Sequence, residues 1–187
     1  MLEVELKAWA DLASARKRLE ALGKKPSKHS VKEDLYFCET TRDPRAIDPL
    51  EDRVVRLRID DKKAVVTAKR KQIDRGIEAS QEIEFGTDSP VAVKELLDYL
   101  GYRPFLKKRK ESHVFEWHRG LNVELNEIEG LGDFVEVETL LPEGSSPEAL
   151  EEARQELRKV LRELGIGEDR IEARPYMVLL RERGAST

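Results

Sequence analysis

Three Glu-x-Glu pairs stand out because each lies at alternating positions of a segment whose other residues are apolar. The pairs are Glu3/Glu5, Glu82/Glu84 and Glu136/Glu138. Basic residues show the same spacing, at Arg56/Arg58, Lys69/Lys71 and Lys107/Arg109, and Lys7 follows the first acidic pair. Carboxylates are hard oxygen ligands that suit Mg²⁺ or Mn²⁺, whereas arginines and lysines hold phosphate oxygens. Together the two sets indicate polyphosphate or nucleotide chemistry that requires a divalent cation.

A spacing of two residues is typical of β-strands that carry one apolar and one charged face. Val55, Leu57 and Ile59 alternate with Arg56 and Arg58 in this way. The same reasoning predicts strands at residues 2–7, 34–39, 55–59, 64–71, 81–85, 105–117, 122–126 and 134–140. Short connections between sequential strands favour an antiparallel sheet and the α+β class. Loops are expected at Asp43-Pro44, at Asp48-Pro49 and over residues 72–79.

Three amphipathic helices recur, one after each Glu-x-Glu strand. They begin after Asp11, Ser89 and Ser146, which are good N-cap residues, and each ends at a Leu-Gly pair. The helices need an apolar surface, and the apolar strand faces provide it, so the charged faces must turn elsewhere. We therefore expect an eight-stranded antiparallel barrel with helices on the outside and a mixed-sign lumen that is wide enough only for side chains or one small ligand.

The composition favours a single folded domain and argues against nucleic-acid-binding, membrane and secreted proteins. The 187 residues, 39% hydrophobic and 39% charged with a net charge of −4, are expected to form one domain over residues 1–187. The net charge argues against a nucleic-acid partner, and no apolar stretch or leader pattern indicates a membrane or secretion, so a cytoplasmic protein is expected. A homodimer is compatible with the sequence.

The cysteine and histidine content argues against a soft-metal centre. Cys38 is the single cysteine and is expected to be a packing residue. His29, His113 and His118 show no metal-binding spacing and are expected to be surface or structural residues. The chain also lacks the glycine-rich P-loop and dinucleotide-binding motifs. Side chains must therefore supply any phosphate contacts.

The ordered motifs resemble those of the CYTH proteins, or triphosphate tunnel metalloenzymes, which include class IV adenylate cyclases and several triphosphatases. The segment at residues 3–7 is similar to the family's Glu-x-Glu-x-Lys signature, and residues 34–37 and 55–58 are similar to its second strand and arginine strand. Residues 66–69, 81–84 and 107–109 resemble its lysine, middle acidic and second basic strands. Residues 130–138 resemble its last signature.

The resemblance implies an eight-stranded tunnel that binds a triphosphate and one or two divalent metals. Carried over to this chain, the metal ligands are Glu3, Glu5, Glu136 and Glu138, and the phosphate-binding residues are Arg56, Arg58, Lys69, Lys107 and Arg109. The implied catalytic residues are Lys7, Glu5 and Glu136, with Lys7 as a phosphate contact or a local base. Glu82 and Glu84 are left without a firm role.

Two positions differ from the family pattern. The chain has Leu125-Asn126 where the family usually has Leu-Asp, and an amide lacks the charge that a carboxylate gives to a metal. The number of metals therefore stays open. Near the C-terminus, Pro175-Tyr176 stands where the family often has Ser-Tyr. Tyr176 is expected either to close one mouth of the tunnel or to pack, with packing favoured.

The sequence favours an adenylate cyclase that converts ATP to cyclic AMP and pyrophosphate, because residues 34–58 look more like that branch. A triphosphatase acting on inorganic triphosphate, thiamine triphosphate or a nucleoside triphosphate is the alternative. A non-catalytic polyphosphate- or nucleotide-binding module and a charge-rich structural domain are further hypotheses. Tunnel residues alone do not identify the phosphorus that is attacked.

Overall fold

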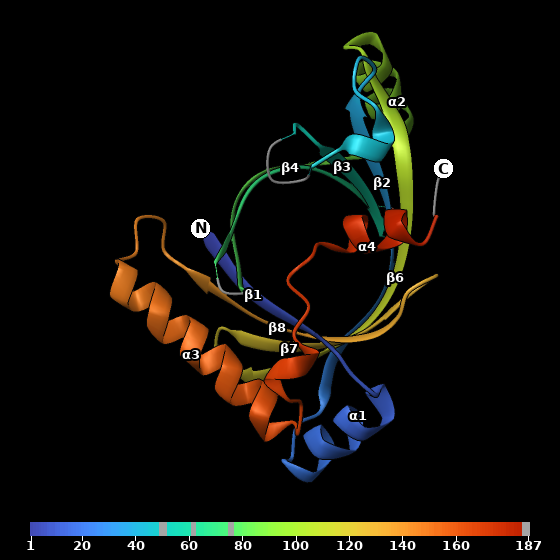
Figure 1. Cartoon of the computed structure of the whole chain (residues 1–187). Helices are drawn as coiled ribbons and strands as arrows, with labels where there is room; N and C mark the ends of the chain where they lie inside the picture. The colour runs from blue at the N-terminus through green and yellow to red at the C-terminus, as the bar shows by residue number, and fades with distance from the viewer. Residues whose placement is uncertain (49–51, 61–62, 75–76, 185–187) are drawn as a thin grey trace.

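The strands of the protein form a closed antiparallel barrel. The computed structural model describes residues 1–48, 52–60, 63–74 and 77–184, and the side chains of residues 69–82 lie outside this description. The strands are β1 (Leu2–Trp9), β2 (Pro26–Glu39), β3 (Val55–Asp60), β4 (Lys63–Asp74), β5 (Ile77–Thr87), β6 (Tyr102–His118), β7 (Leu121–Ile128) and β8 (Gly132–Leu141). Their order is β1-β5-β4-β3-β2-β6-β7-β8, and β1 pairs with both β5 and β8 (Figure 1). The predicted antiparallel barrel is confirmed.

Three helices lie outside the barrel, as the sequence predicts: α1 (Leu12–Ala21), α2 (Pro90–Tyr99) and α3 (Pro147–Glu163). Asp11, Ser89 and Ser146 cap them by accepting hydrogen bonds from backbone N–H groups of the first turn. The glycines after α1 and α3 have φ of 74° and 78°, a left-handed conformation that ends a helix at little cost. Short-range sequence signals therefore set both ends of these helices.

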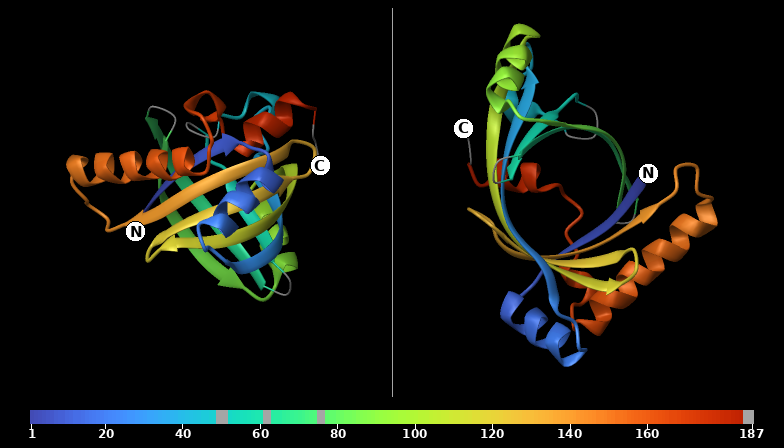
Figure 2. Two further views of the ribbon diagram at one scale, coloured as in Figure 1. Left: turned by 90° about the horizontal axis from the view of Figure 1, so that it is seen from below. Right: turned by 180° about the vertical axis from the view of Figure 1, so that it is seen from behind.

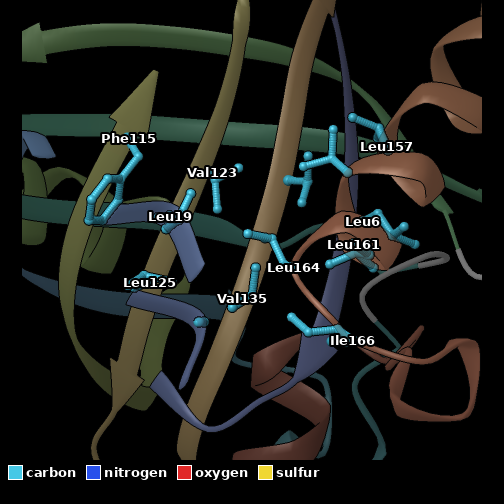
Figure 3. Packing of buried hydrophobic residues seen from close by; sticks show 14 of the residues in the cluster. Leu6, Leu19, Phe115, Val123, Leu125, Val135, Leu157, Leu161, Leu164 and Ile166 are labelled. Carbon is cyan, nitrogen blue, oxygen red and sulfur yellow. The ribbon is translucent and has the colours of Figure 1, made fainter. Parts of the chain in front are cut away.

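The main hydrophobic core lies between α1, α3 and the outer faces of β1, β6, β7 and β8 (Figure 3). Leu6, Val123 and Val135 point outward from their strands into one buried cluster with Leu19 of α1 and with Leu157 and Leu161 of α3. Burial of each such side chain stabilises the fold by about 2 kcal/mol. Because the apolar side chains use the outer faces, the alternating polar side chains of the same strands must face the lumen.

A fourth helix, α4 (Tyr176–Glu182), lies at one end of the barrel and was not predicted. The segment before it crosses the ring of strands in Figure 1, and α4 lies beside β6 at the barrel end in Figure 2. Tyr176 and Leu180 pack there against Leu106, Ile128 and Phe134. The lumen is therefore apolar and covered at this end. Among the described residues, no helix has both the length and the apolar character needed to cross a membrane.

The prediction of a connecting loop over residues 72–79 was wrong for most of that segment. Strand β4 continues to Asp74 and β5 begins at Ile77, and the two pair along their length from Ala64↔Thr87 to Asp74↔Ile77. The polar composition of this segment suggested a loop, but cross-strand hydrogen bonds between β4 and β5 keep it extended. The loop predicted at Asp43-Pro44 is present and includes a 3₁₀ turn at Pro44–Ala46.

Candidate active site

The lumen contains a cavity of about 290 Å³ whose lining is mainly charged. Its cationic side chains come from β1, β2, β3 and β6: Lys7, Lys32, Arg56, Arg58, Lys108 and Lys110. Its carboxylates come from β1, β5, β7 and β8: Glu3, Glu5, Glu84, Glu124, Glu136 and Glu138. The structure thus brings together seven of the predicted site residues, namely Glu3, Glu5, Lys7, Arg56, Arg58, Glu136 and Glu138.

Two basic residues predicted to face the lumen, Lys107 and Arg109, lie on the outer face of β6 instead. The Lys107 Nζ pairs with Glu33 Oε2 at 3.0 Å, and both side chains are about half exposed, at 50% and 45%. The cavity is lined by the intervening residues Lys108 and Lys110. The prediction that Lys107 and Arg109 face the lumen was therefore wrong.

The error has a simple cause: residues 107–110 are all basic, so this segment contains no apolar-polar alternation that assigns its faces. The residue that assigns the faces is Phe115, further along the same strand, which is fully buried in the outer core. Residues two apart on a strand share a face, so Arg109 and Lys107 lie on the same outer face as Phe115. Lys108 and Lys110, at the intervening positions, must then face the lumen. Lys69 and Glu82, also considered from the sequence, fall among the side chains outside the described part.

The buried Asp34 organises the cationic wall. It is fully buried, and Arg58 donates to it through Nε at 2.7 Å and Nη2 at 3.0 Å. Lys108 Nζ lies 2.9 Å from the same carboxylate. The pairing follows from register, since Asp34 stands opposite Arg58 on β3 and Lys108 on β6. Burial alone would raise the pKa of Asp34, but Lys108 and Arg58 hold it well below its ordinary value.

A second polar chain runs across β3, β4 and β5, where Arg56, Thr67 and Glu84 stand in one row. Arg56 Nη2 donates to Thr67 Oγ1 at 3.0 Å, and that hydroxyl donates to Glu84 Oε2 at 3.2 Å. Thr67 is almost fully buried. The row fixes Arg56 toward the lumen and places Glu84, which the sequence left without a firm role, on the cavity wall.

Lys110 forms the centre of the acidic wall. Its Nζ donates to Glu136 Oε2 at 2.6 Å and to Glu124 Oε2 at 2.8 Å. Asn126 Nδ2 donates to the same Glu136 oxygen at 2.6 Å. Burial raises the pKa of Glu136, but the Lys110 ammonium outweighs it and lowers the pKa far below the ordinary value. The amide at position 126, which departs from the family pattern, thus helps to keep Glu136 ionised.

Glu138 lies in the opposite electrostatic environment. It stands opposite Glu5 on β1 and Asn122 on β7. Burial, together with the charges of Glu124, Glu3 and Glu136, raises the pKa of Glu138 to about 7. Negative charge therefore exceeds positive charge at this part of the lumen. The potential metal ligands in this part of the lumen are all carboxylate oxygens, and oxygen ligands of this kind fit Mg²⁺ or Mn²⁺ better than a softer metal.

Lys32 marks a region of excess positive charge. Burial lowers the pKa of Lys32, and the nearby Arg58 and Lys110 lower it further, against the opposing effect of Glu124. Lys32 was not among the site residues predicted from the sequence, although it alternates with Asp34 on β2. An anion bound here would remove the repulsion among these cations. The lumen thus combines a region that favours an anion with a region that favours a cation.

The C-terminal segment holds Lys7 in place. Lys7 Nζ donates to the carbonyl of Arg174 at 2.8 Å and lies 4.7 Å from the centre of the Tyr176 ring. Glu172 fixes this segment by accepting from Trp9 Nε1 at 3.2 Å and from Arg174 Nη2 at 2.7 Å. Tyr176 packs against Phe134, as the sequence favoured, and also lines the cavity.

Comparison with known proteins gives a consistent result. The profile of the CYTH domain matches residues 1–176. A Methanocaldococcus jannaschii protein, named for a proposed adenylate cyclase activity, is 28% identical over 180 residues, which cover 96% of this chain and 98% of that protein. A solved Pyrococcus horikoshii structure is 32% identical with a TM-score of 0.81, covering 97% of this chain and 99% of that one.

A more distant structure shares the fold. A Hippeastrum protein, described as a proposed adenylyl cyclase with a dominant triphosphatase activity, superposes with a TM-score of 0.67 at 21% identity, covering 96% of this chain and 95% of that one. The fold, the charged lumen and the profile match agree with one another. Because the profile spans residues 1–176 of 187, the chain belongs to the CYTH domain family.

Proposed function

We propose that this protein is a divalent-metal-dependent enzyme that binds the phosphate chain of a triphosphate in the barrel lumen. The observation that supports it is the division of the lumen into two charged regions. Lys32, Arg58 and Lys108 line one wall, and Glu3, Glu5 and Glu138 line another part of the same cavity. A triphosphate with its metal ion carries both signs of charge and would balance both regions.

The phosphate-binding role is assigned to residues on three strands. Arg56 and Arg58 of β3 and Lys32 of β2 provide cations on adjacent strands, and Lys108 and Lys110 of β6 extend this surface. Asp34 holds Arg58 and Lys108 in fixed positions before the anion arrives. Prepositioned cations lose little conformational freedom on binding, so they contribute more of their charge interaction to affinity.

The metal-binding role is assigned to Glu3, Glu5, Glu136 and Glu138, which line the cavity. A bound Mg²⁺ or Mn²⁺ would neutralise phosphate charge and activate an attacking oxygen. Glu136 is kept ionised by Lys110 and Asn126, which makes it a ligand rather than a proton acceptor. Lys7, whose Nζ donates to the Arg174 carbonyl, is better suited to contact phosphate than to act as a base.

Hydrolysis of a triphosphate is the reaction that the cavity supports best. Its volume of about 290 Å³ lies at the lower end of the range for ligand pockets. Tyr36 and Tyr176 both lie close to the Lys108 ammonium, at 5.8 and 5.2 Å from the ring centres, and thus beside the phosphate-binding wall. Among the described residues that line the cavity, the few apolar ones, Val54, Pro175 and Met177, lie with Tyr176 at the end covered by α4, so the mainly charged lining offers little apolar surface to a nucleotide base. Water would attack a terminal phosphorus and release orthophosphate.

Cyclisation of ATP, which the sequence favoured, is the second candidate. It is supported by the name of the Methanocaldococcus jannaschii relative, which is similar over nearly its whole length. In that reaction the ribose 3′-hydroxyl would attack the α-phosphorus, and pyrophosphate would leave. The Hippeastrum protein, whose description combines both activities, supports testing the two reactions side by side.

Product analysis separates these candidates. The protein is incubated with inorganic triphosphate or ATP and with Mg²⁺ or Mn²⁺, and the products are separated by ion-exchange chromatography. Orthophosphate release supports hydrolysis, and cyclic AMP with pyrophosphate supports cyclisation. Both activities should be lost in Glu5→Gln and Glu136→Gln. Triphosphate binding without any product would contradict the enzymatic proposal and favour a binding module.

A further inference from the structure

A group of three potential metal ligands lies on the outer wall of the barrel. His29 comes from β2, and Glu111 and His113 come from β6. One ligand atom from each residue lies within 4.8 Å of the others. His29 Nε2 is 2.9 Å from Glu111 Oε1, and the two imidazole rings are stacked with centroids 4.5 Å apart. Among the described residues this is the one such group of three or more.

Strand register brings these residues together. His29 stands directly opposite His113, and Glu111 is two residues from His113 on the same face. The intervening residues Ser30 and Ser112 are buried on the other face. The histidines show no metal-binding spacing along the sequence because His29 and His113 are 84 positions apart. The expectation that all three histidines are only surface or structural residues did not consider this pairing.

We propose that His29, Glu111 and His113 form a binding site for a divalent transition metal of the Zn²⁺ class. Two imidazoles and one carboxylate are a borderline-soft donor set that prefers Zn²⁺ to Mg²⁺. Ligands about 2.0–2.1 Å from a tetrahedral Zn²⁺ are about 3.3 Å apart. The His29 and Glu111 ligand atoms, now 2.9 Å apart, need only a small adjustment to reach that spacing.

The geometry also indicates how the ion is held. Tetrahedral Zn²⁺ has four ligand positions, and the three protein ligands leave one of them for water. Water can reach the ion because the His29 side chain is half exposed to solvent. Arg16 of α1 lies over the ring of Phe115, on the same face as His113, and its positive charge opposes a bound cation. The site is therefore weaker than a closed four-ligand site. It is also independent of the triphosphate proposed for the lumen.

A bound ion would link β2 to β6 through His29 on one strand and Glu111 and His113 on the other. The two strands are already paired in this region, but the first residues of β2, from Pro26 to His29, are exposed to solvent, so the ion would add a contact at an exposed strand end. A ligand that binds only the folded chain raises the melting temperature. Zn²⁺ should therefore stabilise the protein without any triphosphate present.

The test is a titration of the untagged, metal-free protein with Zn²⁺ alone, followed by calorimetry and by thermal unfolding. Variants are His29→Ala, His113→Ala and Glu111→Gln. The matched control is His118→Ala, since His118 is also half exposed and also bonds a carboxylate, Glu156, at 2.8 Å. Glu136→Gln reports on binding in the lumen.

The proposal predicts a Zn²⁺ site that is lost in His29→Ala and His113→Ala, weakened in Glu111→Gln, and retained in His118→Ala and Glu136→Gln. The rise in melting temperature with Zn²⁺ should be lost in the same variants. Circular dichroism without metal confirms that each variant is folded. Absence of Zn²⁺ binding by the unmodified chain would overturn the proposal. So would a site that survives in His29→Ala and disappears in Glu136→Gln, because the ion would then lie in the lumen.

Discussion

Replacement of Asp34 by asparagine tests whether the cationic wall depends on one buried carboxylate. Asp34 is fully buried, Arg58 is 20% exposed and Lys108 is 5% exposed, so these charges have little access to water. The variant keeps the shape of the side chain but removes its charge. In one orientation of the asparagine side chain, its NH₂ group also points toward the cations of Arg58 and Lys108.

The size of the effect follows from the contacts that are lost. Asp34 accepts two hydrogen bonds from Arg58 and one charge-assisted contact from Lys108. Removal of one partner from a buried ion pair costs about 3–5 kcal/mol, because the remaining charge stays buried. We take about 3 kcal/mol, since the asparagine oxygen can still accept from Arg58. For a chain of this length, this corresponds to a fall in melting temperature of about 6–12 °C.

The assay is urea unfolding monitored by circular dichroism, with thermal unfolding as a second measurement. The control is Glu33→Gln, which removes the exposed partner of Lys107 from the adjacent position of β2 and should change stability by less than about 1 kcal/mol. A loss of stability in Asp34→Asn no greater than that in Glu33→Gln would refute the reasoning.

Two other predictions follow from the same electrostatics. The folded pKa of Asp34 is far below its ordinary 3.8, so the folded state releases this proton more readily than the unfolded state. The stability that Asp34 contributes is complete above about pH 5 and is lost as the pH falls through the ordinary pKa toward the folded value. Urea unfolding between pH 6 and pH 3 should therefore show a smaller loss for Asp34→Asn than for the unmodified chain, and equal losses would contradict the assignment. Asn126→Asp places a second carboxylate at the position that now donates to Glu136 at 2.6 Å. It should lower the melting temperature without metal and increase the stabilisation by Mn²⁺, and an unchanged response to Mn²⁺ would count against metal binding beside Glu136.

The parts of the fold that local patterns specify could be predicted from the sequence. Glu3, Glu5 and Lys7 alternate with Leu2, Val4 and Leu6, and this alternation is enough to place them in the lumen once helices cover the apolar face. The starts of α1, α2 and α3 follow from capping residues that act within one turn. These signals are local, so no knowledge of the partner strands was needed.

What could not be predicted depends on contacts between distant segments. The basic run at residues 107–110 does not show which members face inward, and pairing with Asp34 decides in favour of Lys108. Glu124 and Lys32 belong to the site because the strand pairing brings β7 and β2 to the same cavity. His29 and His113 meet only through the register of β2 and β6. In each case, the pairing between strands decides which side chains lie together.

The central claim is that the lumen, and not the outer surface, binds the triphosphate. Lys107 and Lys108 are adjacent on β6 and point to opposite faces, with Lys107 half exposed and Lys108 on the cavity wall. The most direct measurement is calorimetric titration of inorganic triphosphate with Mg²⁺ into Lys107→Gln and Lys108→Gln. The account predicts that Lys108→Gln weakens binding at least about tenfold, as expected for a lost charge-assisted contact, and that Lys107→Gln leaves the affinity unchanged. Equal affinities in the two variants, or a loss confined to Lys107→Gln, would contradict it.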